Sequence, residues 1–121
     1  MKDYKNLIVW QKAHMLTLAI YKISIQFPVE EKFGLASQIR RASSSIAINI
    51  AEGCGYESKK EFVRFLQISS GSANETEYLL QLSLDLGYIK ETDFEKLYGL
   101  ITEIKKMLYS LKQKSKQITN S

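Results

Sequence analysis

Residues 7–28, LIVWQKAHMLTLAIYKISIQFP, decide the class of fold that this sequence encodes. Apolar residues within this stretch follow one another at spacings of four and three: Val9, Ala13, Leu16, Ile20, Ile23 and Phe27. This spacing places them on one face of an α-helix, which is typical of a helix that packs in a bundle. Pro28 ends the pattern, because the residue before a proline avoids the helical region. The stretch therefore predicts a buried helix over about residues 7–26, with Asn6 available to cap its start.

Three further segments, at about residues 32–52, 58–86 and 92–114, have similar helical periodicity. Short loops would join the four helices, and short loops force consecutive helices to lie antiparallel. The sequence therefore predicts an all-α protein: an antiparallel up-down-up-down four-helix bundle that forms a single domain over residues 1–121. We expect residues 117–121 to be disordered.

The predicted core seams contain polar residues as well as apolar ones. The second helix has one seam, formed by Leu35, Ile39, Ala42, Ile46 and Asn49. The third helix has two rows: one is Phe65, Ile68, Ser72, Glu75, Leu79, Leu82 and Leu86, and the other is Val63, Leu66, Ser70, Ala73, Leu80 and Leu84. The fourth helix has one seam, formed by Phe94, Leu97, Ile101, Ile104, Leu108 and Leu111. An unpaired buried carboxylate is unfavourable. We therefore expect Glu75 to belong to a structural polar network with Asn49, and Arg40 and Arg41 are alternative partners.

Small and capping residues add detail to the second and third helices. Residues 42–47 and 69–73 are mostly serine, alanine and glycine, so these two helices could approach each other closely. Gly53 and Gly55 are expected to end the second helix and Gly87 the third, because glycine accepts the left-handed conformation found there. Ser58 with Glu61 has the spacing of a capping box at the start of the third helix.

The composition excludes several classes of protein. Charged residues make up 25% of the chain and hydrophobic residues 45%, as in an ordinary globular domain. Cys54 and His14 are the only cysteine and histidine, so the chain can form neither an internal disulfide nor a structural zinc site. No signal peptide and no apolar run of the roughly 18 residues of a membrane span are present. We expect a non-enzymatic, cytoplasmic protein without a metal, cofactor, small-molecule substrate or membrane association.

Positive charge is concentrated near the C-terminus and in two clusters. The chain has 17 basic and 13 acidic residues, and after Glu103 it has five lysines and no acidic residue. A cationic surface binds polyanions such as RNA or DNA by releasing counterions. The candidate nucleic-acid-binding residues are Arg40, Arg41, Lys59, Lys60, Arg64, Lys105, Lys106 and Lys112, with the tail continuing to Lys116. The alternative is that they form the ordinary charged exterior of a bundle.

Apolar residues remain after the core seams are assigned, and several lie in the first helix. Ile8, Trp10, Tyr21 and Ile25 fall outside its buried stripe. Surplus apolar surface usually marks an interface, and association with identical copies is its simplest use. These residues are therefore candidates for a homo-oligomer interface.

A series of short motifs resembles a known family. They are VWQKA at 9–13, FP at 27–28, FGL at 33–35, QIRRA at 38–42 and SIAINIAEG at 45–53, followed by Glu61-Phe62, Phe65-Leu66, Gly71-Ser72, Glu75 and Gly87-Tyr88. In this order, over about residues 4–112, the chain resembles the bacterial four-helix-bundle family named for proteins encoded in intervening sequences of 23S ribosomal RNA genes.

The resemblance implies a ring-like homopentamer and no catalytic residues. Distant relatives act as accessory proteins to reverse transcriptases in diversity-generating retroelements, and those relatives are basic and bind nucleic acid. The expected function is therefore that of a homo-oligomer that binds nucleic acid non-specifically as an accessory factor. The alternative is a structural scaffold for protein–protein assembly with no nucleic-acid role.

Overall fold

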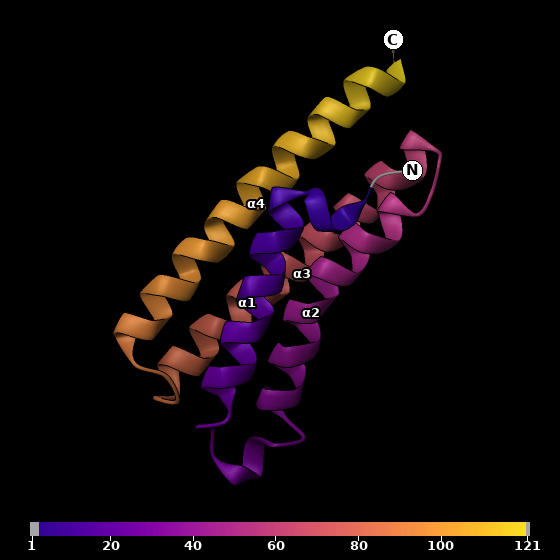
Figure 1. The fold of residues 1–121 in the computed structure, drawn as a ribbon. Helices are drawn as coiled ribbons and strands as arrows, with labels where there is room; N and C mark the ends of the chain where they lie inside the picture. Colours follow the sequence, from indigo (N-terminus) through magenta and orange to yellow (C-terminus); the bar gives the residue numbers. More distant parts are fainter. Residues whose placement is uncertain (1–2, 121) are drawn as a thin grey trace.

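The computed structural model describes residues 3–120, with side chains as far as Gln117. Within this part of the chain, four α-helices pack side by side (Figure 1). They are α1, Ile8–Ser24; α2, Leu35–Cys54; α3, Lys59–Asp85; and α4, Glu91–Asn120, with short 3-10 turns at Tyr4–Asn6 and Val29–Glu31. Consecutive helices pack against each other, and α4 closes the bundle against α1. The predicted all-α, up-down-up-down four-helix bundle is confirmed.

Local hydrogen bonds explain where the first three helices begin. α1 starts after Leu7, not after an Asn6 cap, because residues 4–6 form a separate turn whose start is capped by Asp3. α2 starts at Leu35, later than predicted, and the Glu31 carboxylate accepts a hydrogen bond from the Leu35 backbone N–H at 3.1 Å. α3 starts after Ser58, whose hydroxyl accepts from the Glu61 N–H at 3.3 Å, so this half of the predicted capping box is formed.

α4 continues to Asn120, past the end predicted near residue 114. Its apolar pattern stops at Leu111, but the lysines and glutamines at residues 112–117 favour helix, and Ser115 among them is buried. Residues 117–120 were expected to be disordered, whereas the backbone is helical there. Ser121 and the side chains of residues 118–121 lie outside the described part of the chain.

The core of α1 and α4 matches the predicted seams. In α1, Leu16 and Ile20 are fully buried, and Ile23 is the one residue of the predicted set that is only partly buried. In α4, Ile101, Ile104 and Leu108 are fully buried. These two helices confirm that a strict three-four spacing of large apolar residues identifies a buried face.

The buried face of α3 lies between the two predicted rows. The residues at its centre are Phe62, Leu66, Ser69, Ala73, Thr76, Leu80 and Ser83, all buried and spaced four and three apart. Three of them carry hydroxyls, and each hydroxyl donates to a backbone carbonyl: Ser69 to Ile46 at 2.8 Å, Thr76 to Ser72 at 2.8 Å, and Ser83 to Leu79 at 2.7 Å. Burial of these hydroxyls is tolerated because each is hydrogen-bonded.

The expected burial of Glu75 is wrong, because Thr76 takes the core position and Glu75 is exposed to solvent. Ile68 and Leu86, from the same predicted row, are also exposed. Asn49 is partly buried and donates to the Ser45 carbonyl at 2.8 Å and to the Ser45 hydroxyl at 3.0 Å. The polar network around Asn49 therefore consists of hydroxyls, and no buried carboxylate needs a cation among the residues with described side chains.

α2 and α3 approach closely through small residues, as predicted. The Ser45 and Ser72 hydroxyls are hydrogen-bonded across the interface at 2.8 Å. Gly53, expected to end α2, is instead inside it, and a Cβ there would lie 2.9 Å from Phe65 Cβ. Glycine is needed at this position because the α3 side chains leave no room. Gly87 does follow the end of α3, with a positive φ of 79°.

Glu31 links the loop between α1 and α2 to the loop between α3 and α4. One carboxylate oxygen caps α2, and the other accepts from the Tyr88 hydroxyl at 3.0 Å. This hydrogen bond raises the pKa of Tyr88 above its usual value, because the neutral phenol is the donor. The contact ties the α1–α2 loop to the α3–α4 loop.

Candidate oligomer and nucleic-acid surfaces

The outer face of α1 is an apolar stripe. Ile8, Met15, Leu18 and Ile25 follow at spacings of seven, three and seven, on the side of the helix opposite its buried residues. Each is more than half exposed, from 56% for Met15 to 75% for Ile25. The stripe runs the whole length of α1, about 26 Å at 1.5 Å per residue.

Two of the four residues predicted for the oligomer interface lie elsewhere on α1. Trp10 is partly buried; its ring stacks on His14 at 5.1 Å and meets the edge of Tyr4 at 4.9 Å. Tyr21 lies under the Arg40 guanidinium, 4.8 Å from the ring centre. The structure therefore places Ile8 and Ile25 on the outer face and turns Trp10 and Tyr21 toward α2.

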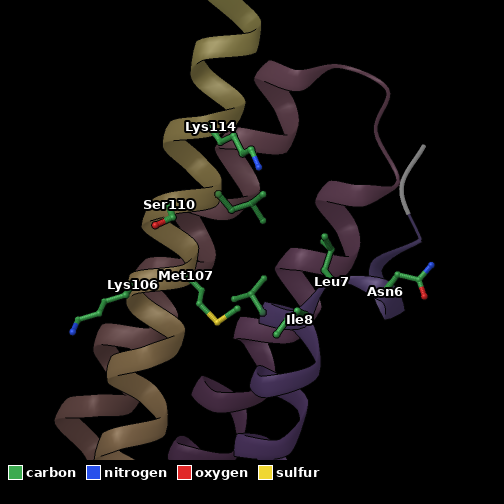
Figure 2. Close-up of a pocket in the computed structure, with 9 residues that line it drawn as sticks. Asn6, Leu7, Ile8, Lys106, Met107, Ser110 and Lys114 are labelled. Carbon is green, nitrogen blue, oxygen red and sulfur yellow. The ribbon is translucent and has the colours of Figure 1, made fainter.

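A groove opens between the start of α1 and the second half of α4 (Figure 2). It has a volume of about 560 Å³, and its walls are mostly apolar, formed by Leu7, Ile8, Met107 and neighbouring residues. Figure 2 shows the Met107 side chain pointing across the groove toward Ile8, whereas Lys106 points away. Ile8 belongs to both features, so the groove continues into the apolar stripe of α1.

Arg40 has a structural role. Its Nε donates to the Ser24 hydroxyl at 2.7 Å, and its Nη2 donates to the Tyr21 carbonyl at 3.1 Å. That carbonyl lies in the last turn of α1 and also accepts a hydrogen bond from the Ser24 hydroxyl at 3.2 Å. The guanidinium also suits the negative pole of the α1 dipole. Arg40 therefore holds the end of α1 against α2, and we leave it out of any proposed nucleic-acid surface.

Replacing Arg40 with alanine should lower the free energy of unfolding by about 1.5–3 kcal/mol, the usual contribution of hydrogen bonds to a charged group. Arg40→Lys should recover little of this, because an ammonium lacks the planar fork that reaches both acceptors. Urea denaturation followed by circular dichroism measures the change. Arg41→Ala is the matched control, because Arg41 is exposed. Equal stability of the Arg40→Ala and Arg41→Ala variants would contradict the structural role.

The other basic candidates do not form a single patch. Arg41 is 13 residues before the end of α2, about 20 Å along the axis from the turn that leads to Lys59 and Lys60. Arg64 pairs with Glu61 at 3.1 Å. Lys59 and Lys60 are exposed and, within residues 3–117, have no carboxylate at ion-pair distance.

The three candidates on α4 do not all lie on one face of the helix. Lys105 pairs with Glu77 of α3 at 3.0 Å, and Lys112 lies on the same side of the helix. Lys106 lies beside the groove on another face of α4, with its side chain pointing away from α1 (Figure 2). The end of α4 lies at the same end of the bundle as the α2–α3 turn (Figure 1), so its last lysines and Lys59 and Lys60 share that end.

Comparison with known proteins identifies the family. The family model described as 23S rRNA-intervening sequence protein matches residues 5–110. The chain belongs to this family. The predicted resemblance is therefore confirmed over nearly the whole bundle.

One solved relative of this 23S rRNA-intervening sequence protein comes from Bacteroides thetaiotaomicron VPI-5482. It is described as a protein of unknown function from the S23 ribosomal protein family. The two chains are 33% identical, with a TM-score of 0.81, and the match covers 88% of this chain and 96% of the relative. No protein with a curated description matches. Membership in the family thus supplies the fold, while the relative's described function is unknown.

Sequence reasoning missed part of the α1 stripe in this 23S rRNA-intervening sequence protein. Met15 and Leu18 were not assigned to the interface, although they are as exposed as Ile8. The signal was present in the spacing, because residues 8, 15, 18 and 25 share one face of a helix.

Among the described residues, no helix is both long and apolar enough to cross a membrane.

Proposed function

We propose that this 23S rRNA-intervening sequence protein is a non-enzymatic cytoplasmic protein that assembles into a ring-like homo-oligomer, with five copies favoured. In that form it binds nucleic acid without sequence preference, as an accessory factor. The observation that carries the proposal is the exposed apolar stripe of α1, formed by Ile8, Met15, Leu18 and Ile25.

The stripe and the groove together support assembly. Contiguous apolar surface that is exposed in a single chain typically marks an interaction site. A closed ring needs two different surfaces on each copy that fit each other. In the proposed ring, Met15, Leu18 and Ile25 supply one surface and the groove beside Leu7 and Met107 supplies the other, and Ile8 lies where the two meet. Burying both would remove this apolar area from water, which favours association.

Positive charge supports nucleic-acid binding by the assembled form. The chain has a net charge of +4, and one end of the bundle carries Lys59, Lys60 and the last lysines of α4. A ring would repeat this end around its axis. When several weak contacts form together, the overall affinity can exceed that of a single contact by a factor of about 10² or more. Contacts of this kind read phosphate and carry no sequence information.

The test is a fluorescence-anisotropy titration of the assembled protein with labelled RNA and DNA at several salt concentrations. Affinity should fall steeply with salt, because released counterions drive binding. The triple variant Lys59→Ala, Lys60→Ala, Arg64→Ala should bind all sequences more weakly. The slope of the logarithm of its binding constant against the logarithm of the salt concentration should be smaller in magnitude by about one for each phosphate that the variant no longer neutralises.

A matched triple variant controls for net charge. Lys22, Lys32 and Lys90 are exposed at the opposite end of the bundle, and their replacement by alanine removes the same charge. This control should bind like the unmodified protein. No detectable binding at low salt would contradict the nucleic-acid role and favour the alternative, an assembly scaffold. Equal decreases in affinity in both triple variants would show that only net charge matters.

A further inference from the structure

α4 carries a second row of surface residues in which tyrosines alternate with lysines. Tyr98, Lys105, Tyr109, Lys112 and Lys116 are spaced seven, four, three and four residues apart, so they lie on one face of the helix. We call this row the tyrosine–lysine stripe. The ion pair between Lys105 and Glu77 of α3 shows that the stripe borders α3. It is about 27 Å long at 1.5 Å per residue.

The two tyrosines present their rings to solvent. Tyr109 is 60% exposed, and Tyr98 is 44% exposed. Tyr98 is also supported from behind, since its ring stacks on Phe94 with the centres 5.5 Å apart. A supported, exposed aromatic ring is a surface on which another flat ring can stack.

Charge along the stripe is positive. From Tyr98 to Lys116 the only acidic residue of α4 is Glu103, and it lies on the other side of the helix, paired with Lys12 at 2.9 Å. Lys112 and Lys116 have no carboxylate at ion-pair distance in the part of the chain that has described side chains. The facing residue Glu77 is already neutralised by Lys105. An anionic partner therefore meets cations that are free to bind it.

We propose that the tyrosine–lysine stripe binds single-stranded nucleic acid. Lys112 and Lys116 contact phosphates, and Tyr98 and Tyr109 stack on unpaired bases. Alternation of cations with aromatic rings along a surface is how proteins hold single strands without reading their sequence. A duplex cannot use the rings, because its bases are stacked on each other inside the helix. This proposal rests on the proposed nucleic-acid function and names its substrate class.

Three labelled probes of one length, about 12 nucleotides, test the proposal with the assembled protein. They are oligouridine, a hairpin duplex, and an abasic strand that keeps the sugar–phosphate backbone but has no bases. The unmodified protein should bind oligouridine more tightly than either of the others. The Tyr98→Ala, Tyr109→Ala variant should bind oligouridine about fivefold or more weakly per ring removed and should bind the abasic strand as before.

Matched variants separate stacking from charge. Tyr98→Phe with Tyr109→Phe keeps the rings and should keep the preference for oligouridine. Lys112→Ala with Lys116→Ala should weaken binding of oligouridine and the abasic strand alike. This weakening should shrink at high salt, whereas the weakening caused by removing the rings should persist. Lys32→Ala with Lys90→Ala, at the opposite end of the bundle, removes the same charge and should leave the binding of all three probes unchanged.

Several results would overturn the proposal. The abasic strand could bind as tightly as oligouridine, or the tyrosine-to-alanine variant could bind every probe like the unmodified protein. Either result would reject only this site and would leave the proposed nucleic-acid binding intact. If the protein bound none of the three probes, the proposed function would be rejected as well. A changed oligomer mass in the tyrosine-to-alanine variant would also overturn it, because the stripe would then be an interface between copies.

Discussion

Glutamate in place of both Met15 and Leu18 should convert the oligomer into monomers of 13.9 kDa. Both side chains are more than half exposed in the single chain, so the change should leave the fold intact. In the assembly, each copy would bury two charges in an apolar contact, and unpaired buried charge is strongly unfavourable. Light scattering after size exclusion measures the mass directly.

A charge-matched control belongs with this experiment. Gln67→Glu with Thr92→Glu adds the same charge at exposed positions of α3 and α4, away from the stripe of α1. That variant should keep the mass of the unmodified protein. Retention of the oligomer by the Met15→Glu, Leu18→Glu variant, with a normal helical circular-dichroism spectrum, would show that α1 does not form the interface.

Leu79→Ala should lower the free energy of unfolding by about 2–5 kcal/mol, because it removes a buried side chain and leaves a cavity. Leu79 is 3% exposed and belongs to the main hydrophobic core. For a domain of this size, such a decrease is a large fraction of the total stability. Chemical denaturation of both proteins at one concentration measures the difference.

Gln81→Ala is the comparison for this prediction. Gln81 is exposed on the same helix, and its amide makes one surface hydrogen bond to Asp85 at 2.9 Å. The variant should differ from the unmodified protein by no more than about 0.5 kcal/mol. If Leu79→Ala also changed stability by less than about 1 kcal/mol, Leu79 would not be a core residue.

The sequence predicts the bundle well where large apolar residues mark the core. α1 and α4 depend on leucine and isoleucine at three-four spacings, and nine of their twelve predicted residues are buried, with Ile23, Phe94 and Leu111 partly buried. In α3 the core positions Ser69, Thr76 and Ser83 look like surface positions in the sequence. Ser69 donates to a carbonyl of α2, a partner that only the folded chain provides, whereas Thr76 and Ser83 donate to carbonyls four residues back in α3.

The candidate surfaces were harder to predict for a related reason. Arg40 and Arg41 are neighbours in sequence, but one caps α1 and the other faces solvent. Which cations remain free depends on how each helix is rotated and on which carboxylates the packing brings near, as with Lys105 and Glu77. Counting charges along the sequence shows neither how a helix is rotated nor which carboxylates lie near a cation.

Native mass spectrometry with a short single-stranded RNA tests at once whether this chain forms a homo-oligomer and whether that homo-oligomer binds nucleic acid. We predict a complex of several copies, five being favoured, each of 13.9 kDa, with RNA bound to the assembly. A different number of copies would revise the size of the ring. A single free chain of 13.9 kDa without RNA, at micromolar concentration and low salt, would contradict the account.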